Sequence, residues 1–336
     1  MVTIKDVAKA AGVSHTTVSR ALNGNPLIKL ETRERIGRIA REMNYIPNYS
    51  ARSLVMKKPH TIGLFFSSLG QSTTASFLED AIKGIRSELD ESFNLSVSAI
   101  DEVNHLDSLS PQRFSGILIV SQSEVDVEFI RHVQKANIPF VVLNRQMNEP
   151  GISWVAANDR DGTRAAIDYA IACGHRKLAI LEGKPGYKSS MERKLGFLDS
   201  LKAAGISLPS EYQIAGDYSM ESGFAAMEEL LELPDPPTFV FCSNDDMAIG
   251  ALKACYSRKL DVPGALSLIG FDDMPFARYA NPALTTIHKP TLEICKTGIR
   301  MLLLRLSDPS TESEQRLIET SLVLRDSVAR LTPAEE

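Results

Sequence analysis

The chain begins with short apolar stripes whose spacing is that of α-helices. The first stripe falls at positions i, i+3, i+4 and i+7 and consists of Ile4, Val7, Ala8 and Ala11. Thr3 followed by Asp6 is the pattern of an N-terminal capping box, and Gly12 can adopt the left-handed conformation that ends a helix. The pattern therefore predicts a short helix followed by a tight turn.

Two more helices are expected before residue 45. Ser14 is a favourable N-cap for the second, whose inward face is formed by Val18, Ala21 and Leu22. The third spans about residues 32–44 and carries arginines on its outer side: Arg33, Arg35, Arg38 and Arg41. Three short helices with a tight turn between the first two form a helix-turn-helix, a motif whose second helix enters the DNA major groove.

The outward face of the second helix has the residue types that contact nucleic acid. It presents short hydrogen-bonding side chains and one guanidinium: His15, Thr16, Thr17, Ser19 and Arg20. Such groups suit base edges and phosphates. A helical hairpin with an ordinary polar outer face is the alternative interpretation of the same pattern.

From residue 61 the pattern changes to apolar runs that alternate with amphipathic stretches. The runs "TIGLFFS", "SGILIVS", "PFVVLN" and "TFVFCSN" are typical of strands, whereas "SFLEDAIKGIRSELD" and "DDMAIGALKACYSR" are typical of helices. This βαβ rhythm implies parallel sheets covered by helices on both faces. A stretch of about 270 residues favours two such doubly wound lobes over one.

Charge separates the beginning of the chain from the rest. Residues 1–58 contain eleven basic and four acidic side chains, a net charge of +7, which leaves −12 for the remainder of a chain with net charge −5. A basic segment on an acidic protein indicates a polyanionic partner for that segment alone. A solvated charged face is the alternative.

Composition excludes some other classes of protein. The chain is 43% hydrophobic and 24% charged, which is ordinary for a globular protein. No apolar run approaches the roughly 18 residues of a membrane helix, and the N-terminus lacks a signal-peptide core, so we expect a cytoplasmic protein. The four widely spaced cysteines favour buried, reduced thiols, and we expect neither a metal nor another cofactor.

Motifs along nearly the whole chain follow the order of one known family. "TIKDVAKAAGVSHTTVSRALNG" is followed by "YIPNYSARSL" and later by "GHRKLAIL", "SNDDMAIGALKA", "SLIGFDD", "PALTTI" and "LVLRDS". The chain thus resembles the lactose/galactose repressor (LacI/GalR) family of bacterial transcription regulators. The resemblance implies that His15, Thr16 and Arg20 contact bases. It implies phosphate or capping contacts for Thr3, Ser14, Thr17, Ser19 and Asn23.

The segment 47–60 is expected to link the DNA-binding part to the rest of the chain. Pro47 prevents continuation of a helix, and Asn48 can cap a short helix that carries Ala51 and Leu54. A flexible linker is the alternative. The resemblance implies that two such hinge helices of a dimer lie in the minor groove, with Leu54 as a wedge between base steps and Ala51 where the helices approach.

By the same resemblance, the remainder has the periplasmic sugar-binding fold, with a ligand cleft between two lobes. After a helix-turn-helix domain over 1–46, the first lobe is expected over 61–157 with 288–314, and the second over 158–287 with 315–332. The implied ligand-binding residues are Ser67, Asn144, Arg193, Tyr218, Asn244 and Asp272. The residues themselves leave helix capping open for Asn244, an ion pair for Arg193 and plain packing for Tyr218.

Two departures from the family bear on these expectations. Lys29 stands where the family usually has a helix cap, so the cap of the third helix either shifts to Thr32 or is lost. The loop "SSLGQSTTASF" is longer than usual, and the segment before "GILIV" is shorter, which leaves the ligand contacts of the first lobe the least defined.

Two other classes of protein fit the sequence less well than a regulator does. "GKPGYKS" lacks the spacing of a phosphate-binding loop, and the paired acids at 245–246 and 272–273 have no histidine at metal-ligand spacing, so we expect no catalytic residues. A periplasmic sugar-binding protein would not need the basic helical segment. We therefore expect a dimeric repressor that binds operator DNA, has no membrane partner, and controls a carbohydrate-utilisation operon through a sugar or sugar derivative.

Overall fold

The computed structural model describes residues 2–22, 25, 27–45, 60–70, 74–103 and 105–331. It divides the chain into two compact units, residues 1–59 and 60–336, which we call the head and the body. Each unit is described by itself.

The head contains three helices, α1 (Ile4–Ala11), α2 (His15–Leu22) and α3 (Leu30–Glu42). Their apolar stripes meet in one small core of buried residues: Val7, Ala8, Ala11, Val18, Ala21, Ile36 and Ala40. The helix-turn-helix prediction is confirmed, because α1 and α2 are joined by a turn of three residues in which Gly12 has a φ of 64°.

The predicted helix starts in the head are largely confirmed. Thr3 Oγ1 donates to Asp6 Oδ2 at 2.7 Å in a capping box, and the Thr17 amide donates to Ser14 Oγ at 3.1 Å. The N-cap of α3 is Lys29, whose side chain makes no cap hydrogen bond. Of the two outcomes expected there, the cap is lost rather than shifted to Thr32.

The first lobe of the body is built on a six-stranded parallel sheet in the order β11-β5-β4-β3-β1-β2. Its strands are β1 (Thr61–Phe66), β2 (Asn94–Ala99), β3 (Gly116–Val120), β4 (Phe140–Leu143), β5 (Trp154–Ala157) and β11 (Gln315–Ile318). Successive residues are buried on opposite faces: Leu64 packs with α5 (Ala75–Arg86) and α11 (Thr291–Ser307), and Phe65 packs with α6 (Val127–Lys135). Burial on both faces explains why these strands read as unbroken apolar runs.

The second lobe contains a four-stranded parallel sheet in the order β7-β6-β8-β9. Its strands are β6 (Leu178–Glu182), β7 (Gln213–Ala215), β8 (Phe239–Cys242) and β9 (Ser267–Ile269). Helices α9 (Met220–Leu231) and α10 (Asp245–Ser257) cover one face, and α7 (Asp159–Ala172) and α8 (Lys188–Ala203) cover the other. Both lobes are doubly wound, as the sequence predicts.

Short elements complete the body. Strands β10 (Thr286–His288) and β12 (Ser321–Val323) form an antiparallel pair. Single 3₁₀ turns occur at η1 (Leu106–Ser108), η2 (Glu124–Asp126) and η3 (Ser210–Tyr212), and a longer one at η4 (Pro275–Tyr279).

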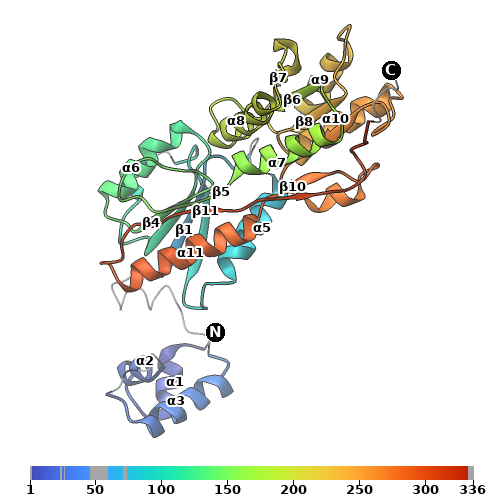
Figure 1. Ribbon diagram of the computed structural model, residues 1–336. Helices are drawn as coiled ribbons and strands as arrows, with labels where there is room; N and C mark the ends of the chain where they lie inside the picture. Colours follow the sequence, from blue (N-terminus) through green and yellow to red (C-terminus); the bar gives the residue numbers. More distant parts are fainter. Residues whose placement is uncertain are drawn as a thin grey trace. The chain divides into compact units, whose positions relative to one another are not determined.

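The chain passes between the lobes at three places, after β5, after β10 and after β11 (Figure 1). The third crossing differs from the expected boundary at residue 315, because β11 pairs with β5 and completes the first sheet. Residues 315–318 therefore belong to the first lobe. The sequence could not locate this crossing, since both segments around it have strand-like patterns and neither pattern identifies its partner.

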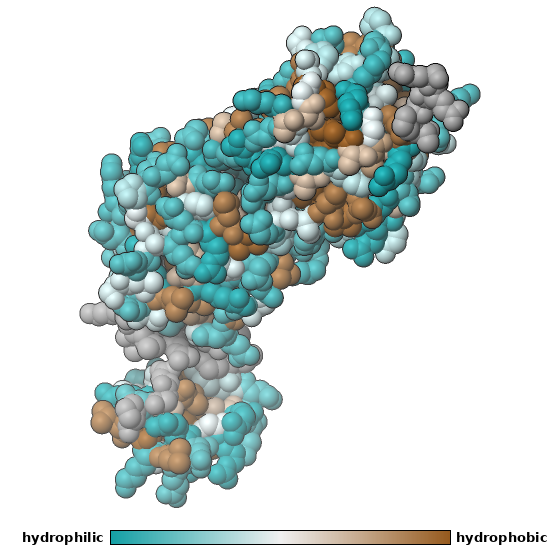
Figure 2. All heavy atoms as spheres, viewed as in Figure 1, coloured by the Kyte–Doolittle hydropathy of each residue, from teal (hydrophilic) through white to brown (hydrophobic). Residues whose placement is uncertain are grey.

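On the face of the body shown in Figure 2, hydrophilic residues predominate and hydrophobic ones lie in separate small patches. Within the described part of the chain, no helix is both long and apolar enough to cross a membrane. All four cysteines are buried and free, as predicted: Cys173, Cys242, Cys255 and Cys295.

Candidate functional site

The carboxyl ends of strands from both lobes face one buried pocket. Eleven residues line it: Thr74, Phe77, Gln122, Asn144, Tyr187, Ser189, Arg193, Tyr218, Asn244, Asp272 and Lys289. Gln122 and Asn144 follow β3 and β4 of the first lobe, whereas Asn244 and Asp272 follow β8 and β9 of the second. Ligands of doubly wound sheets bind at this end of the strands.

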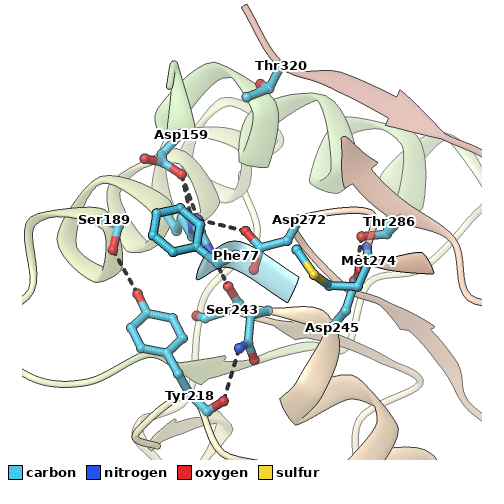
Figure 3. Close-up of polar contacts among 12 residues, drawn as sticks. Phe77, Asp159, Ser189, Tyr218, Ser243, Asp245, Asp272, Met274, Thr286 and Thr320 are labelled. Atoms are coloured by element: carbon cyan, nitrogen blue, oxygen red, sulfur yellow. Dashed lines mark hydrogen bonds and ion pairs between the residues drawn. The ribbon is translucent and has the colours of Figure 1, made fainter. Parts of the chain in front are cut away.

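Arg193 of α8 is the centre of the polar network on the second lobe. Its Nε donates to Asp159 Oδ1 at 2.9 Å, its Nη1 donates to the Ser243 carbonyl, and its Nη2 donates to Asp272 Oδ1 at 3.4 Å. The guanidinium carbon also lies 3.6 Å from the ring centroid of Phe271. Dashed lines in Figure 3 run from Asp159, Ser243 and Asp272 toward this one group. Arg193 is therefore held in one orientation before any ligand binds.

Tyr218 is fixed beside this network. Its hydroxyl and Ser189 Oγ are 3.0 Å apart, and its carbonyl accepts from Asn244 Nδ2 at 3.0 Å. A Cβ atom on Gly183 would lie 2.2 Å from the tyrosine ring, so glycine is needed there to make room. Asn244 Oδ1 accepts from the Met247 amide at 2.9 Å, which makes Asn244 the N-cap of α10.

Three pocket residues have backbone conformations that residues other than glycine rarely adopt. Asn144, Tyr218 and Asp272 have φ angles of 66°, 75° and 108°. Such strain costs of order 1–3 kcal/mol per residue and is commonly concentrated at functional sites. The pocket thus combines buried charge with a strained backbone.

Burial and charge shift the pKa values of the pocket residues. Burial lowers the pKa of Arg193, but the nearby carboxylates of Asp159 and Asp272 outweigh it, so the pKa is raised. Burial raises the pKa of Tyr218 to about 12. The pKa of Asp272 is raised by burial, although Arg193 and Lys289 oppose the shift. At neutral pH the pocket holds a neutral phenol and a charged guanidinium.

Five of the six predicted ligand residues line the pocket, and Ser67 does not. Ser67 Oγ donates to Asp126 Oδ2 at 2.6 Å and accepts from the Gln122 amide at 2.9 Å. Ser67 therefore positions the loop that carries Gln122 instead of lining the pocket itself. The capping alternative for Asn244 is also observed, so this residue both caps α10 and lines the pocket.

The sequence analysis missed several pocket residues. They are Thr74, Phe77, Gln122, Tyr187, Ser189 and Lys289, together with Asp159, which binds Arg193. Thr74 and Phe77 begin α5, next to a loop whose length differs from the family pattern. Lys289 lies at a crossing between lobes, and no local sequence signal distinguishes it from the other charged residues of that segment.

Three of the four paired acids, Asp245, Asp272 and Asp273, have partners within the protein. Asp245 accepts from the Met274 amide at 2.7 Å and from Thr286 Oγ1 at 2.6 Å. Asp273 binds Arg325 Nη2 at 2.5 Å and His288 Nδ1 at 3.2 Å. These bonds connect the loops of the second lobe. Within the described residues, no group of His, Cys, Asp and Glu side chains is placed to hold a metal ion.

The head presents part of the predicted DNA-contact face to solvent. His15, Thr16 and Arg20 of α2 are exposed, while Thr17 and Ser19 are half-buried. Thr3 and Ser14 are engaged in capping, one of the two roles expected for them.

Arg33 is not free on the outer face of α3, contrary to expectation, because its Nη2 donates to the carbonyls of Asn25 and Ile28 at 3.1 and 3.3 Å. The turn after α2 leaves these carbonyls within reach of a side chain on the first turns of α3. The other predicted DNA contacts, Asn23, Asn48, Ala51 and Leu54, lie outside the described residues.

A helix-turn-helix head and a two-lobed body with a buried polar pocket define a DNA-binding regulator that responds to a small molecule. Residues 3–48 match the bacterial regulatory proteins of the lacI family, and residues 167–328 match a periplasmic binding protein-like domain. The chain belongs to the LacI family of bacterial transcriptional regulators.

Relatives and solved structures agree with this assignment. The chain is 49% identical to the probable HTH-type transcriptional repressor ExuR of Bacillus subtilis, over 99% of this chain and all of the relative. The lac repressor dimer bound to operator and the anti-inducer ONPF is similar with a TM-score of 0.84 and 29% identity, covering 98% of this chain and 99% of that one. A complex of the transcriptional regulator CelR with cellobiose has a TM-score of 0.74 and 29% identity, covering 97% and 100%.

Proposed function

We propose that this regulator is a repressor whose affinity for operator DNA is set by a sugar or sugar derivative bound between the lobes. It acts in the cytoplasm as a dimer, so that two recognition helices contact the two halves of a pseudo-palindromic site. The single observation that carries the proposal is the pocket itself, where five residues predicted as ligand contacts come together from two lobes.

The chemistry of the pocket supports a ligand with several hydroxyl groups. Asp272 can accept hydrogen bonds, Asn144 can both donate and accept, and the rings of Phe77, Tyr187 and Tyr218 offer apolar faces to the C–H side of a sugar. The CelR structure was solved with cellobiose, which supports a carbohydrate for this chain as well. Of the acids that could suggest catalysis, Asp245 and Asp273 are bound to structural partners, which supports a role without an enzymatic reaction.

The proposed base contacts are the exposed residues at the start and end of α2. His15 and Thr16 lie in its first turn and Arg20 in its last, and all three are exposed. A guanidinium that binds a base edge contributes about 1–3 kcal/mol of discrimination against the wrong base. The hinge contacts of Ala51 and Leu54 remain part of the proposal.

The recognition helix is tested by selecting a duplex from a random library with the full chain. Affinity for that duplex is then measured by fluorescence anisotropy at several salt concentrations. Arg20→Ala should weaken binding to the selected duplex by roughly tenfold or more and should reduce its preference over random duplex. Lys202→Ala, an exposed lysine of α8 in the body, is the control. Equal affinity of both variants for the selected duplex would remove α2 from recognition.

A further inference from the structure

Lys289 is a buried cation whose side chain has no polar partner among the described residues. It is 6% exposed and lines the pocket at the crossing between β10 and α11. No hydrogen bond or ion pair of the described residues reaches its Nζ, which lies 5.4 Å from the centroid of the Phe77 ring. A buried ammonium without acceptors is unfavourable, so its retention at this position needs an explanation.

Asn144 is the second unpartnered polar side chain of the same pocket. It is also 6% exposed, and both its Nδ2 and its Oδ1 lack a hydrogen-bond partner. Buried amides in folded proteins are almost always hydrogen-bonded, and exceptions indicate either a functional constraint or a missing ligand. Two such groups in one pocket point to a ligand that satisfies both.

Arg193, by contrast, already has its charge paired with carboxylates of the protein. All three of its nitrogens donate to protein oxygens, those of Asp159, Ser243 and Asp272. The positive charge that is free to bind a ligand in this pocket is therefore that of Lys289.

We propose that the effector is an acidic sugar, whose carboxylate or phosphate group is bound by Lys289 with Asn144 beside it, while its hydroxyl groups face Asp272. This inference rests on the proposed function and specifies the chemical class of its ligand. Lys289 is then the residue that selects acidic over neutral sugars.

The charges around Lys289 are consistent with this assignment. Burial lowers the pKa of Lys289, while the carboxylates of Asp159 and Asp272 act to raise it. Both carboxylates bind Arg193 through Oδ1, and among the described residues neither forms an ion pair with Nζ. An anionic oxygen adds Coulombic attraction to its hydrogen bond with a buried ammonium, which a neutral sugar hydroxyl does not supply.

The test compares sugars that differ only in the acidic group. Galacturonate with galactose, and glucuronate with glucose, are the carboxylate pairs, and glucose 6-phosphate with glucose is the phosphate pair. Calorimetric titration of the full chain gives the dissociation constant of each. The variants are Lys289→Gln, which keeps a hydrogen-bonding group without the charge, and the exposed control Lys202→Gln. Binding of each variant to duplex DNA without sugar checks that it is folded.

We expect at least one acidic sugar to bind about tenfold or more tightly than its neutral counterpart. In Lys289→Gln this preference should fall to within about twofold, whereas Lys202→Gln should retain it. Preference for the carboxylate or for the phosphate pair identifies the acidic group.

Two results would overturn the inference. If neutral sugars bind as tightly as acidic ones, or if Lys289→Gln keeps the preference, the assignment of an acidic group bound by Lys289 is wrong. The proposed function would still stand. If no sugar of either kind binds to a chain that still binds DNA, both this inference and the carbohydrate effector fail.

Discussion

The two walls of the pocket differ in how many of their polar groups have hydrogen-bond partners in the protein. On the second lobe, the side chains of Arg193, Tyr218 and Asn244 all have protein partners. On the opposite side, Asn144 of the first lobe and Lys289 at the crossing have none among the described residues. The second lobe is thus a preorganised surface, whereas the facing side has polar groups that the proposed ligand would satisfy.

This difference suggests how a ligand can act on the shape of the body. The lobes touch at the pocket, where the Lys188 amide donates to the Gln122 carbonyl at 3.1 Å and Ser123 forms a β-bridge with Tyr187. A ligand held by the second lobe would add the bonds that Asn144 and Lys289 lack. It would thereby favour the arrangement with the lobes together, by the free energy of those additional contacts.

The largest expected effect follows from disrupting the preorganised wall. Arg193→Ala leaves the carboxylates of Asp159 and Asp272 buried without their cation, which should lower the free energy of unfolding by about 3–5 kcal/mol. Urea unfolding of the full chain, followed by circular dichroism, measures the loss. Arg160→Ala breaks the ion pair with Asp199 on the surface and should cost at most about 1 kcal/mol. Similar losses in the two variants would contradict the central role of Arg193.

An intermediate effect is expected at Asp246, in the first turn of α10. Burial raises the pKa of Asp246 to about 6, with a further contribution from Asp272, and its Oδ2 has no hydrogen-bond partner. The folded protein therefore binds the proton more tightly than the unfolded chain, so Asp246 costs stability as the pH rises through about 4 to 6. Asp246→Asn removes this cost.

The Asp246→Asn variant should gain roughly 1–3 kcal/mol over the parent at pH 7.5 and nothing at pH 4. The measurement is the difference in free energy of unfolding between the two proteins at both pH values. A gain that is equal at both would show that charge is not its origin.

The smallest stability effect is expected on the unsatisfied wall. Asn144→Gly suits the positive φ of this position and removes an amide without partners, so the free energy of unfolding should change by less than about 1 kcal/mol. The stabilisation of the protein by a bound sugar, measured by thermal shift, should nevertheless decrease clearly. Asn244→Ala is the matched comparison, because loss of its cap on α10 should cost about 1–2 kcal/mol without any ligand. If Asn144→Gly were the more destabilising of the two, the difference between the walls would not hold.

Much of the fold could be predicted because the local patterns agree with the global structure. Helical stripes and caps located α1 and α2, and apolar runs buried on both faces located the parallel strands. The placement of β11 could not be predicted, since pairing partners in a sheet depend on contacts distant in sequence.

The pocket residues likewise include some that the sequence could predict and others that it could not. Asn244 and Asp272 could be identified because they directly follow strands, at the place where ligands of such folds bind. Ser67 has the same kind of position, but its side chain binds Asp126, which follows the neighbouring strand β3, and no local pattern encodes this contact. Asp159 and Lys289 could not be identified, because their places in the pocket depend on groups far away in the chain, Arg193 and Phe77.

The central claim is that a ligand in the body sets the affinity of the head for DNA. It is tested most directly by measuring how the sugar changes DNA affinity and how DNA changes sugar affinity. The affinity of the full chain for its selected duplex is determined with and without saturating sugar, and the affinity for that sugar with and without saturating duplex. The account predicts that both affinities change by the same factor, about 5-fold to 150-fold. An unchanged DNA affinity when the pocket is fully occupied would contradict it.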